Sequence, residues 1–330
     1  MKFGPVALED ALGAILAHSV AVPGGRLRKG RVLTGDDLQS LRAAGITEPT
    51  VARLDPGDIG EDAAAERLAR AIVPDPKRAG LRLGKPATGR VNIHAEAPGV
   101  VEVLADRIDA LNALHPMITV ATVPRWQRSH PRGMVATVKI IAYAVPEAAL
   151  EAACLAGQGA LRLRPVTCRT ADLIQTATDA AEDGVKGQRV TAERLDRLGI
   201  TLGDLTVVPH RIEALAERLS ASQAEAILIL TGSATSDLYD VAPEALRRAG
   251  GEVAHFGMPV DPGNLLFFGS LGGRPVIGLP GCARAPALNG ADWVLERLMC
   301  GVPVTPRDIA GMGVGGLLKE IPQRGRLRES

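Results

Sequence analysis

The hydrophobic pattern is most regular in the C-terminal half of the chain. Apolar residues between Ile212 and Leu219 follow the i, i+3, i+4, i+7 spacing of an amphipathic helix. The run Ala226–Leu230 is apolar at every position, as expected for a strand covered on both faces of a parallel sheet. A helical pattern over 241–248 then leads to a strand over 252–256. This alternation predicts an α/β fold with a doubly wound, mostly parallel sheet.

Further elements of this sheet are expected before and after this segment in the sequence. A strand over 173–176, a helix opening at Thr191 and a strand over 205–208 are expected before it. After it, apolar runs flank Gly272-Gly273, which indicates a β-hairpin. A final helix is expected over 286–299.

The N-terminal half mixes short helices and strands. A helical pattern covers 8–16, and a second helix is expected between a capping box at Thr34 and Asp37 and a stop at Gly45. A strand over 50–54 and a helix over 61–72 follow. Together with the break at Pro74-Asp-Pro76, they predict a smaller α+β N-terminal lobe over residues 1–75.

β-Branched runs over 118–123 and 134–145 surround one helix capped at Asp106. They predict a β-rich lobe over 76–155, separated by a crossing segment from the α/β domain over 165–305. The glycine- and arginine-rich residues 306–330 are expected to be a flexible C-terminal tail.

Composition excludes several function classes. The 330 residues carry a net charge of +1, so no basic surface for nucleic acid is indicated, and 2% aromatic residues leave few rings for stacking bases. The four cysteines lie far apart without a CxxC pair, which argues against a zinc ribbon or a disulfide framework and favours the reducing cytoplasm. No signal peptide and no apolar run of about 20 residues is found, so no membrane span is expected.

Candidate chemistry lies in loops that follow predicted strands, because ligands of open α/β sheets bind beyond the carboxyl ends of the strands. The loop 231–240 offers Gly232 for close backbone approach, hydroxyl groups, and the start of a helix, which together suit a phosphate. Asp237 and Asp240 add carboxylates, which suit a divalent cation or a hydroxyl-rich ligand beside the anion. Ordinary turn and cap chemistry is the alternative interpretation.

A second loop, 278–286, combines a tight turn at Pro280-Gly281 with the thiol of Cys282 and the guanidinium of Arg284. Cys282 could equally be a small buried hydrophobic residue. A third segment, 261–264, could be no more than the turn before the hairpin.

Taken in their order along the chain, the three segments resemble the molybdopterin-binding domain shared by enzymes of molybdenum-cofactor assembly. The family's Gly-Gly-x-Ser-x-Gly-x-x-Asp loop is matched by 230–240, its Pro-Gly-Lys-Pro element by 262–269, and its Gly-Leu-Pro-Gly-Asn-Pro loop by 278–283. The Thr-Gly-Asp-Glu element of the molybdenumtransferase falls at 176–179, and 30–46 is similar to another of its segments.

The runs 257–264, 279–286 and 289–298 are more specifically similar to the molybdopterin-binding region that precedes molybdenum-cofactor cytidylyltransferase domains. The nucleotide loop of such a cytidylyltransferase domain does not occur in this sequence.

Departures from the family pattern bear on the mechanism that the resemblance implies. Asn264 replaces the family's lysine, Ser233 and Asp237 replace loop glycines, and Cys282-Ala283 replaces Asn-Pro. Losing a lysine and gaining a carboxylate makes the pocket more negative by about two charge units, which weakens the electrostatic hold on phosphate. These changes favour binding over catalysis of metal insertion.

The resemblance implies a protein that binds molybdopterin or the molybdenum cofactor, or its nucleotide form, in cofactor biosynthesis, maturation or delivery. Asp240 and Asp179 would take the acidic, catalytic positions. Mg²⁺ is the further cofactor that the resemblance suggests. The expected cofactor-binding residues are Thr231, Gly232, Ser233, Ala234, Thr235, Ser236, Asp237, Pro262, Gly263, Asn264, Pro280, Gly281, Cys282 and Arg284.

Two alternatives remain open. One is an active molybdopterin molybdenumtransferase that inserts molybdate with release of AMP. The other is a non-catalytic partner of a separate cytidylyltransferase or of an apo-molybdoenzyme. In each case the ligand is a pterin, and the family implies a homodimer without nucleic-acid or membrane partners.

Overall fold

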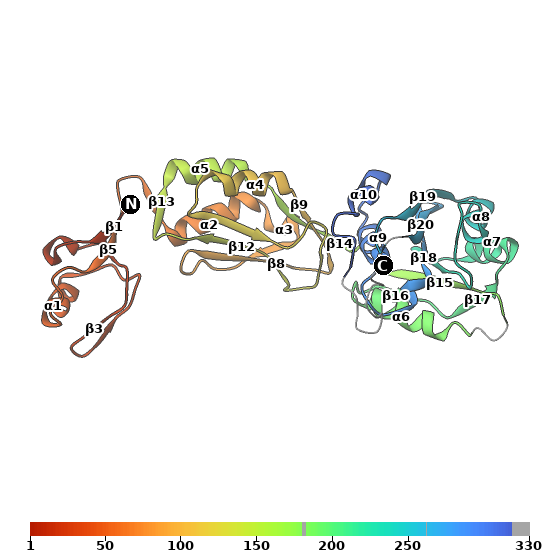
Figure 1. The fold of residues 1–330 in the computed structure, drawn as a ribbon, viewed down its shortest axis with the longest axis horizontal. Coiled ribbons are helices and arrows are strands. Elements are labelled where there is room, and N and C mark those ends of the chain that lie inside the picture. Colours follow the sequence, from red (N-terminus) through yellow and green to blue (C-terminus); the bar gives the residue numbers. More distant parts are fainter. Residues whose placement is uncertain (180–182, 262, 319–330) are drawn as a thin grey trace, which may run out of the picture. The chain divides into compact units, whose positions relative to one another are not determined.

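The structure is a computed structural model that describes residues 1–179, 183–261 and 263–318. The chain divides into two compact units (Figure 1). The first consists of Met1–Glu96, Val101–Arg125 and Arg132–Leu163, and the second of Ala97–Val100, Trp126–Pro131 and Arg164–Ser330. The predicted lobe over 1–75 falls within the first unit, whereas the predicted lobe over 76–155 contributes residues 97–100 and 126–131 to the second.

The first part of unit 1 is built around a small antiparallel sheet in the order β1-β5-β2. The predicted capping box is present: the Asp37 carboxylate accepts from the Thr34 amide at 3.0 Å, and the Thr34 hydroxyl accepts from the Asp37 amide at 3.4 Å. The predicted helix over 8–16 is wrong. A 3₁₀ turn η1 (Leu8–Ala11) is followed by strand β2, because Gly13 takes a left-handed φ of 78° between them. The elements here are β1 (Lys2–Pro5), β2 (Ile15–Leu16), β3 (Val20–Val22), β4 (Gly25–Leu27), α1 (Gly35–Ala43) and β5 (Thr50–Arg53).

The second part of unit 1 is β-rich, with a four-stranded antiparallel sheet in the order β10-β12-β8-β7. Asp106 does not cap its helix, since α4 begins one residue earlier and Asp106 lies in the first turn. The elements from residue 58 to 165 are β6 (Asp58–Gly60), α2 (Glu61–Ile72), α3 (Pro76–Ala79), β7 (Leu81–Leu83), β8 (Arg90–Ala95), β9 (Gly99–Val103), α4 (Ala105–Leu114), β10 (Ile118–Thr122), β11 (Arg128–Ser129), β12 (Met134–Ile140), β13 (Ala144–Pro146), α5 (Glu147–Ala156) and β14 (Leu161–Pro165).

Unit 2 contains a seven-stranded sheet in the order β16-β15-β18-β21-β20-β19, with β17 also paired to β15. The pairs of β15 with β16, β17 and β18, and of β18 with β21, are parallel, whereas β20 and β19 are antiparallel additions. The predicted mostly parallel sheet is therefore confirmed. The strands are β15 (Thr170–Ala177), β16 (Thr201–Leu202), β17 (Thr206–Pro209), β18 (Ala226–Leu230), β19 (Glu252–Met258), β20 (Asn264–Leu271) and β21 (Arg274–Leu279).

Helices cover both faces of this sheet, which confirms the doubly wound arrangement. Leu228 and Leu230 of β18 join a core cluster with residues of α9, while Ile227 and Ile229 join a second cluster with residues of α7 and α8. Because side chains alternate along a strand, the two clusters lie on opposite faces. The helices are α6 (Val185–Asp196), α7 (Ile212–Ala221), α8 (Val241–Arg248), α9 (Gly290–Met299) and α10 (Pro306–Gly311), with a 3₁₀ turn η2 (Gly281–Arg284).

Helix α6 begins six residues earlier than predicted, at Val185 rather than Thr191. Long-range packing fixes this start: Gln175 Nε2 donates to the Gly184 carbonyl at 2.7 Å. At Gly187 an added Cβ would lie 2.2 Å from Gln175 Oε1, so a larger residue here would displace the Gln175 side chain.

The C-terminal elements also differ from prediction. Helix α9 begins at Gly290 rather than 286, because Asn289 and Asp292 form a capping box. Residues from 306 onward do not start a flexible tail, since α10 forms and Ile309 and Met312 are buried in the core. The rest of the predicted tail, 319–330, lies outside the described residues. Within the described part of the chain, no helix combines the length and apolar character needed to cross a bilayer.

Candidate functional site

Sheet topology places the two predicted loops side by side. Strands β18 and β21 are parallel neighbours, with Leu230 paired to Leu279, so the segments that follow them leave the same carboxyl edge of the sheet. Arg284 connects them directly: its Nη2 donates to the Thr231 carbonyl at 2.9 Å. The structure thus brings 231–240 and 278–284 together, as the sequence predicts.

The third segment reaches the same edge from the other direction. Strand β20 runs antiparallel to β21, so its first residue, Asn264, lies where β21 ends. Asn264 Nδ2 donates to Asn289 Oδ1 at 3.1 Å, and Asn289 Nδ2 donates to the Cys282 sulfur at 2.9 Å. Asn264 is buried and positions its neighbours, whereas Gly263 and Cys282 are exposed. Pro262 lies outside the described residues.

The two acidic residues of loop 231–240 hold the loop in shape. Asp240 caps α8 by accepting from the Val241 amide at 2.7 Å, and its second oxygen accepts from the Ser236 amide at 2.8 Å. Asp237 Oδ1 accepts from the Tyr239 amide at 2.8 Å. These three contacts are ordinary cap and turn chemistry, the alternative to a ligand role, and Asp240 places a carboxylate at the N-terminus of α8.

The hydroxyl groups of the loop differ in accessibility. Thr231 and Thr235 are buried, with their hydroxyl oxygens 3.4 Å apart. Ser233 and Ser236 are exposed, and Ser236 Oγ donates to the Ala234 carbonyl at 3.3 Å. Of the serine and threonine hydroxyl groups of the loop, those of Ser233 and Ser236 are therefore the accessible ones.

The backbone of the same loop provides unused donors. Gly232 N donates to Thr176 Oγ1 at 3.0 Å, but the next amides, those of Ser233, Ala234 and Thr235, have no acceptor among the residues that the structure describes. Backbone amides without an acceptor are available to an anion where a turn lets them converge. This is the strongest anion-binding feature of the edge.

Two side chains to which the sequence analysis assigned no role in the site, Thr176 and Arg194, support the edge from β15 and α6. Thr176 Oγ1 also lies 2.8 Å from His210 Nδ1, which ties three segments to one hydroxyl group. Arg194, only 6% exposed, pairs with Asp292 at 2.7 Å. Its guanidinium also donates to three backbone carbonyls of the segment between β21 and α9. These are the carbonyls of Ala283 at 2.7 Å, Ala285 at 2.8 Å and Ala287 at 3.2 Å.

We expect Thr176→Val to lower the unfolding free energy by about 1–3 kcal/mol, since the Gly232 amide and His210 lose their shared partner in a buried place. Urea unfolding measures the difference. Thr201→Val, on the exposed start of edge strand β16, is the matched control and should change little. Equal unfolding free energies for Thr176→Val and the unmodified chain would refute this assignment.

A cavity of about 520 Å³ opens at the carboxyl ends of β15 and β17. Asp179 and Asp183 contribute its acidic groups, so the structure places Asp179 at the same edge as the two loops. Its lining residues are Ala177, Thr178, Asp179, Asp183, Val207, Val208 and Pro209. In the described ranges, no three His, Cys, Asp or Glu side chains gather closely enough to hold a metal ion by themselves.

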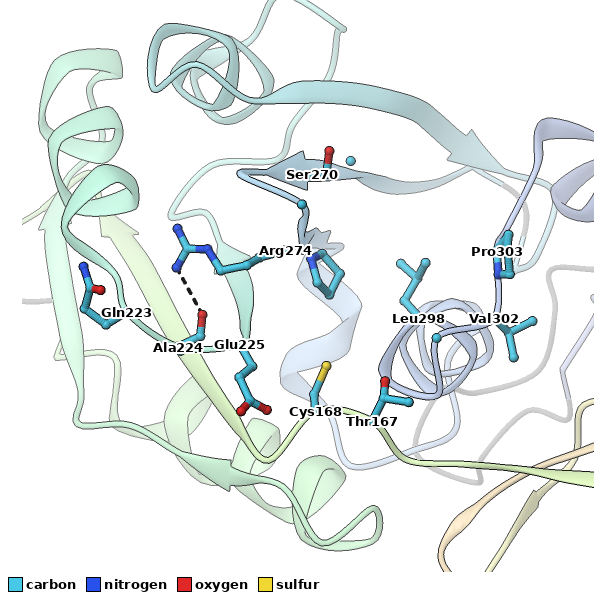
Figure 2. Close-up of a pocket in the computed structure, with 14 residues that line it drawn as sticks. Thr167, Cys168, Gln223, Ala224, Glu225, Ser270, Arg274, Leu298, Val302 and Pro303 are labelled. Atoms are coloured by element: carbon cyan, nitrogen blue, oxygen red, sulfur yellow. Dashed lines mark hydrogen bonds between the residues drawn. The ribbon is translucent and has the colours of Figure 1, made fainter. Parts of the chain in front are cut away.

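A slightly larger cavity, about 570 Å³, lies at the opposite, amino edge of the sheet (Figure 2). It is lined by residues that precede β15 and β18, among them Cys168 and Glu225. Arg274 is engaged by the Ser222 and Ala224 carbonyls, at 2.8 and 3.1 Å. Burial raises the pKa of the Cys168 thiol, so this thiol is poorly suited to reaction as a thiolate. We place the functional site at the carboxyl edge, where the free amides are.

Comparison with known proteins gives family matches for parts of this chain. Residues 186–299 match a family model described as a probable molybdopterin binding domain, and residues 5–53 match a domain of unknown function, DUF8806. No functionally curated protein matches the sequence.

Solved structures provide distant similarities. A molybdopterin biosynthesis MoeA protein from Pyrococcus horikosii is 13% identical over 94% of this chain and 76% of that chain, with a TM-score of 0.30. MogA is 19% identical over 40% of this chain and 91% of that chain, with a TM-score of 0.28. A molybdenum cofactor biosynthesis protein from Pyrococcus furiosus is 12% identical over 94% of this chain and 65% of that chain, with a TM-score of 0.24.

Proposed function

We propose that this protein binds molybdopterin, the molybdenum cofactor or its nucleotide form at the carboxyl edge of the sheet, a proposal supported by the match of residues 186–299 to a probable molybdopterin binding domain. The binding would serve cofactor biosynthesis, maturation or delivery. The observation that carries the proposal is the row of free amides at Ser233, Ala234 and Thr235. Molybdopterin ends in a phosphate, and such amides suit its negative charge.

The surrounding residues supply the rest of the pocket. Arg284 adds positive charge where it holds the Thr231 carbonyl, and Gly281 and Cys282 form the facing wall. The cavity beside Asp179, at the same edge, offers carboxylate acceptors to N–H groups of the ligand. Asn264 and Asp240 act on the ligand indirectly, through the Asn289 contact and the loop fold respectively.

A molybdenumtransferase activity is the second candidate, and one observation favours it. Asp179 and Asp183 line the same cavity, and Mg²⁺ is commonly held by one or two carboxylates together with substrate phosphates. These two residues would hold the ion, which would supply charge neutralisation for the phosphates. AMP release from adenylylated molybdopterin in the presence of molybdate and Mg²⁺ tests this activity.

Binding is tested with the full chain and molybdopterin under anaerobic conditions, with the retained pterin measured by fluorescence after oxidation. We expect the unmodified chain to retain pterin and Ala234→Pro to bind it about 10- to 100-fold more weakly, because proline removes one donor to a charged group. Asp204→Pro is the control: Asp204 is exposed, and its amide has no acceptor within the described part of the chain. Absence of retained pterin on the unmodified chain, or equal affinity of Ala234→Pro, would contradict the proposal.

A further inference from the structure

Tyr239 is an unusually exposed ring on the loop that carries the free amides. Its exposed fraction is 77%, in a chain with two tyrosines and 2% aromatic residues. The other tyrosine, Tyr143, is partly buried and its hydroxyl donates to the Ala17 carbonyl at 2.9 Å. Tyr143 thus has a structural role through its hydrogen bond. The exposed ring of Tyr239, in contrast, contributes little to the packing of unit 2.

The Tyr239 ring is held in place on one side. The guanidinium carbon of Arg247, on α8, lies 5.2 Å from the centre of the ring. Arg247 Nη1 is itself fixed, since it donates to the Leu238 carbonyl at 2.7 Å and to Glu244 at 3.0 Å. A cation covers one face of the ring, and the high exposure leaves the other face open.

The fold of the loop brings the ring close to the amides. Asp240, the residue after Tyr239, accepts from the Ser236 amide at 2.8 Å, and Ser236 is the residue after Thr235. The ends of the segment that separates the free amides from the ring are therefore tied together. One ligand can reach both features if it carries an anionic group and a flat ring.

We propose that the open face of Tyr239 stacks against the planar nitrogen heterocycle of the ligand whose phosphate occupies the amides of Ser233, Ala234 and Thr235. This inference rests on the proposed function and identifies a specificity-determining residue for it. An aromatic side chain with two rotatable torsions, already held by Arg247, loses little conformational entropy on stacking. The pterin ring and the base of a nucleotide form share this chemistry.

Equilibrium binding to the full chain tests the proposal with three probes: molybdopterin under anaerobic conditions, 5′-AMP, and pyrophosphate, which has no ring. Tyr239→Ala should weaken molybdopterin binding about 10- to 100-fold, the range found when stacking aromatics are truncated, and Tyr239→Phe should restore it to within about threefold. Leu238→Ala, at the neighbouring exposed apolar position, is the matched control and should bind molybdopterin like the unmodified chain. Pyrophosphate affinity should be the same in all four proteins.

The outcomes separate this inference from the function on which it rests. If the unmodified chain does not bind molybdopterin, both the proposed function and the stacking role fail. If it binds and Tyr239→Ala binds equally well, only the stacking role fails. A parallel loss of pyrophosphate affinity in Tyr239→Ala would also overturn it, because the loop itself would then be disturbed. Weakening of 5′-AMP but not of molybdopterin would assign the platform to the nucleotide base and overturn its role with the pterin.

Discussion

Arg194→Met is expected to lower the unfolding free energy by about 3–5 kcal/mol, the loss typical of breaking a buried ion pair from one side. Arg194 and Asp292 are almost entirely buried, and the substitution leaves the Asp292 carboxylate without its 2.7 Å partner. The carbonyls of Ala283, Ala285 and Ala287 lose their donors as well. Chemical denaturation of the full chain, followed by circular dichroism, gives the value.

Two comparisons test whether the buried network around Arg194 causes this loss of stability. Arg248→Met breaks an exposed ion pair with Glu213 and should cost at most about 1 kcal/mol. In the double variant with Asp292→Asn the two losses should not add, because both residues belong to one network. A loss in Arg194→Met no larger than that in Arg248→Met would show that this network does not support the wall of the site.

Stability of unit 2 is expected to fall as the pH rises from about 5 to about 8, because of Glu296 on α9. Burial raises the pKa of Glu296 from its ordinary value of 4.5 to about 7, and neighbouring Asp292 adds to the rise although Arg128 opposes it. The folded state therefore binds a proton more tightly than the unfolded state. This stabilisation is complete below pH 4.5 and is lost as the pH rises through 7, a change on the order of 3 kcal/mol.

Unfolding free energies measured across this pH range test the effect. Glu296→Gln keeps the shape of the side chain and removes the titration, so its stability should vary much less with pH. Arg128, whose Nε lies 2.8 Å from Glu296 Oε1, pairs with this carboxyl group, and Arg197 is a second cation that lowers its pKa. A pH profile of Glu296→Gln that parallels the unmodified chain would assign the dependence to another group.

Much of the α/β fold follows from local sequence patterns. The all-apolar run of β18 and the helical spacing of α7 were sufficient, because the first reflects burial on both faces of a strand and the second reflects burial that repeats about every 3.6 residues. The hairpin was predictable because Gly272 and Gly273 both take left-handed φ values, 58° and 78°, which the turn requires. The start of α9 was missed although Asn289 and Asp292 have capping-box spacing, because Pro286 offered a competing helix start.

The site was predictable only in part, because contacts between residues that are distant in sequence leave no local pattern. Loops after neighbouring parallel strands must share an edge, so the meeting of 231–240 with 278–284 follows from the order of elements. The roles of Arg194 and His210 could not be predicted, because their partners are distant in sequence and depend on turn conformations. No local pattern indicates that an arginine in the last turn of α6 binds carbonyls 89 to 93 residues away.

Amide hydrogen exchange of the full chain, with and without molybdopterin under anaerobic conditions, tests most directly where the ligand binds. Protection is predicted in two segments, 231–236 and 280–284, because the ligand would occupy free amides in the first and cover the second. The amino-edge cavity segments 223–225 and 298–303 should exchange at unchanged rates. Protection confined to those amino-edge segments, or exchange unchanged throughout the chain, would contradict a pterin site at the carboxyl edge of the sheet.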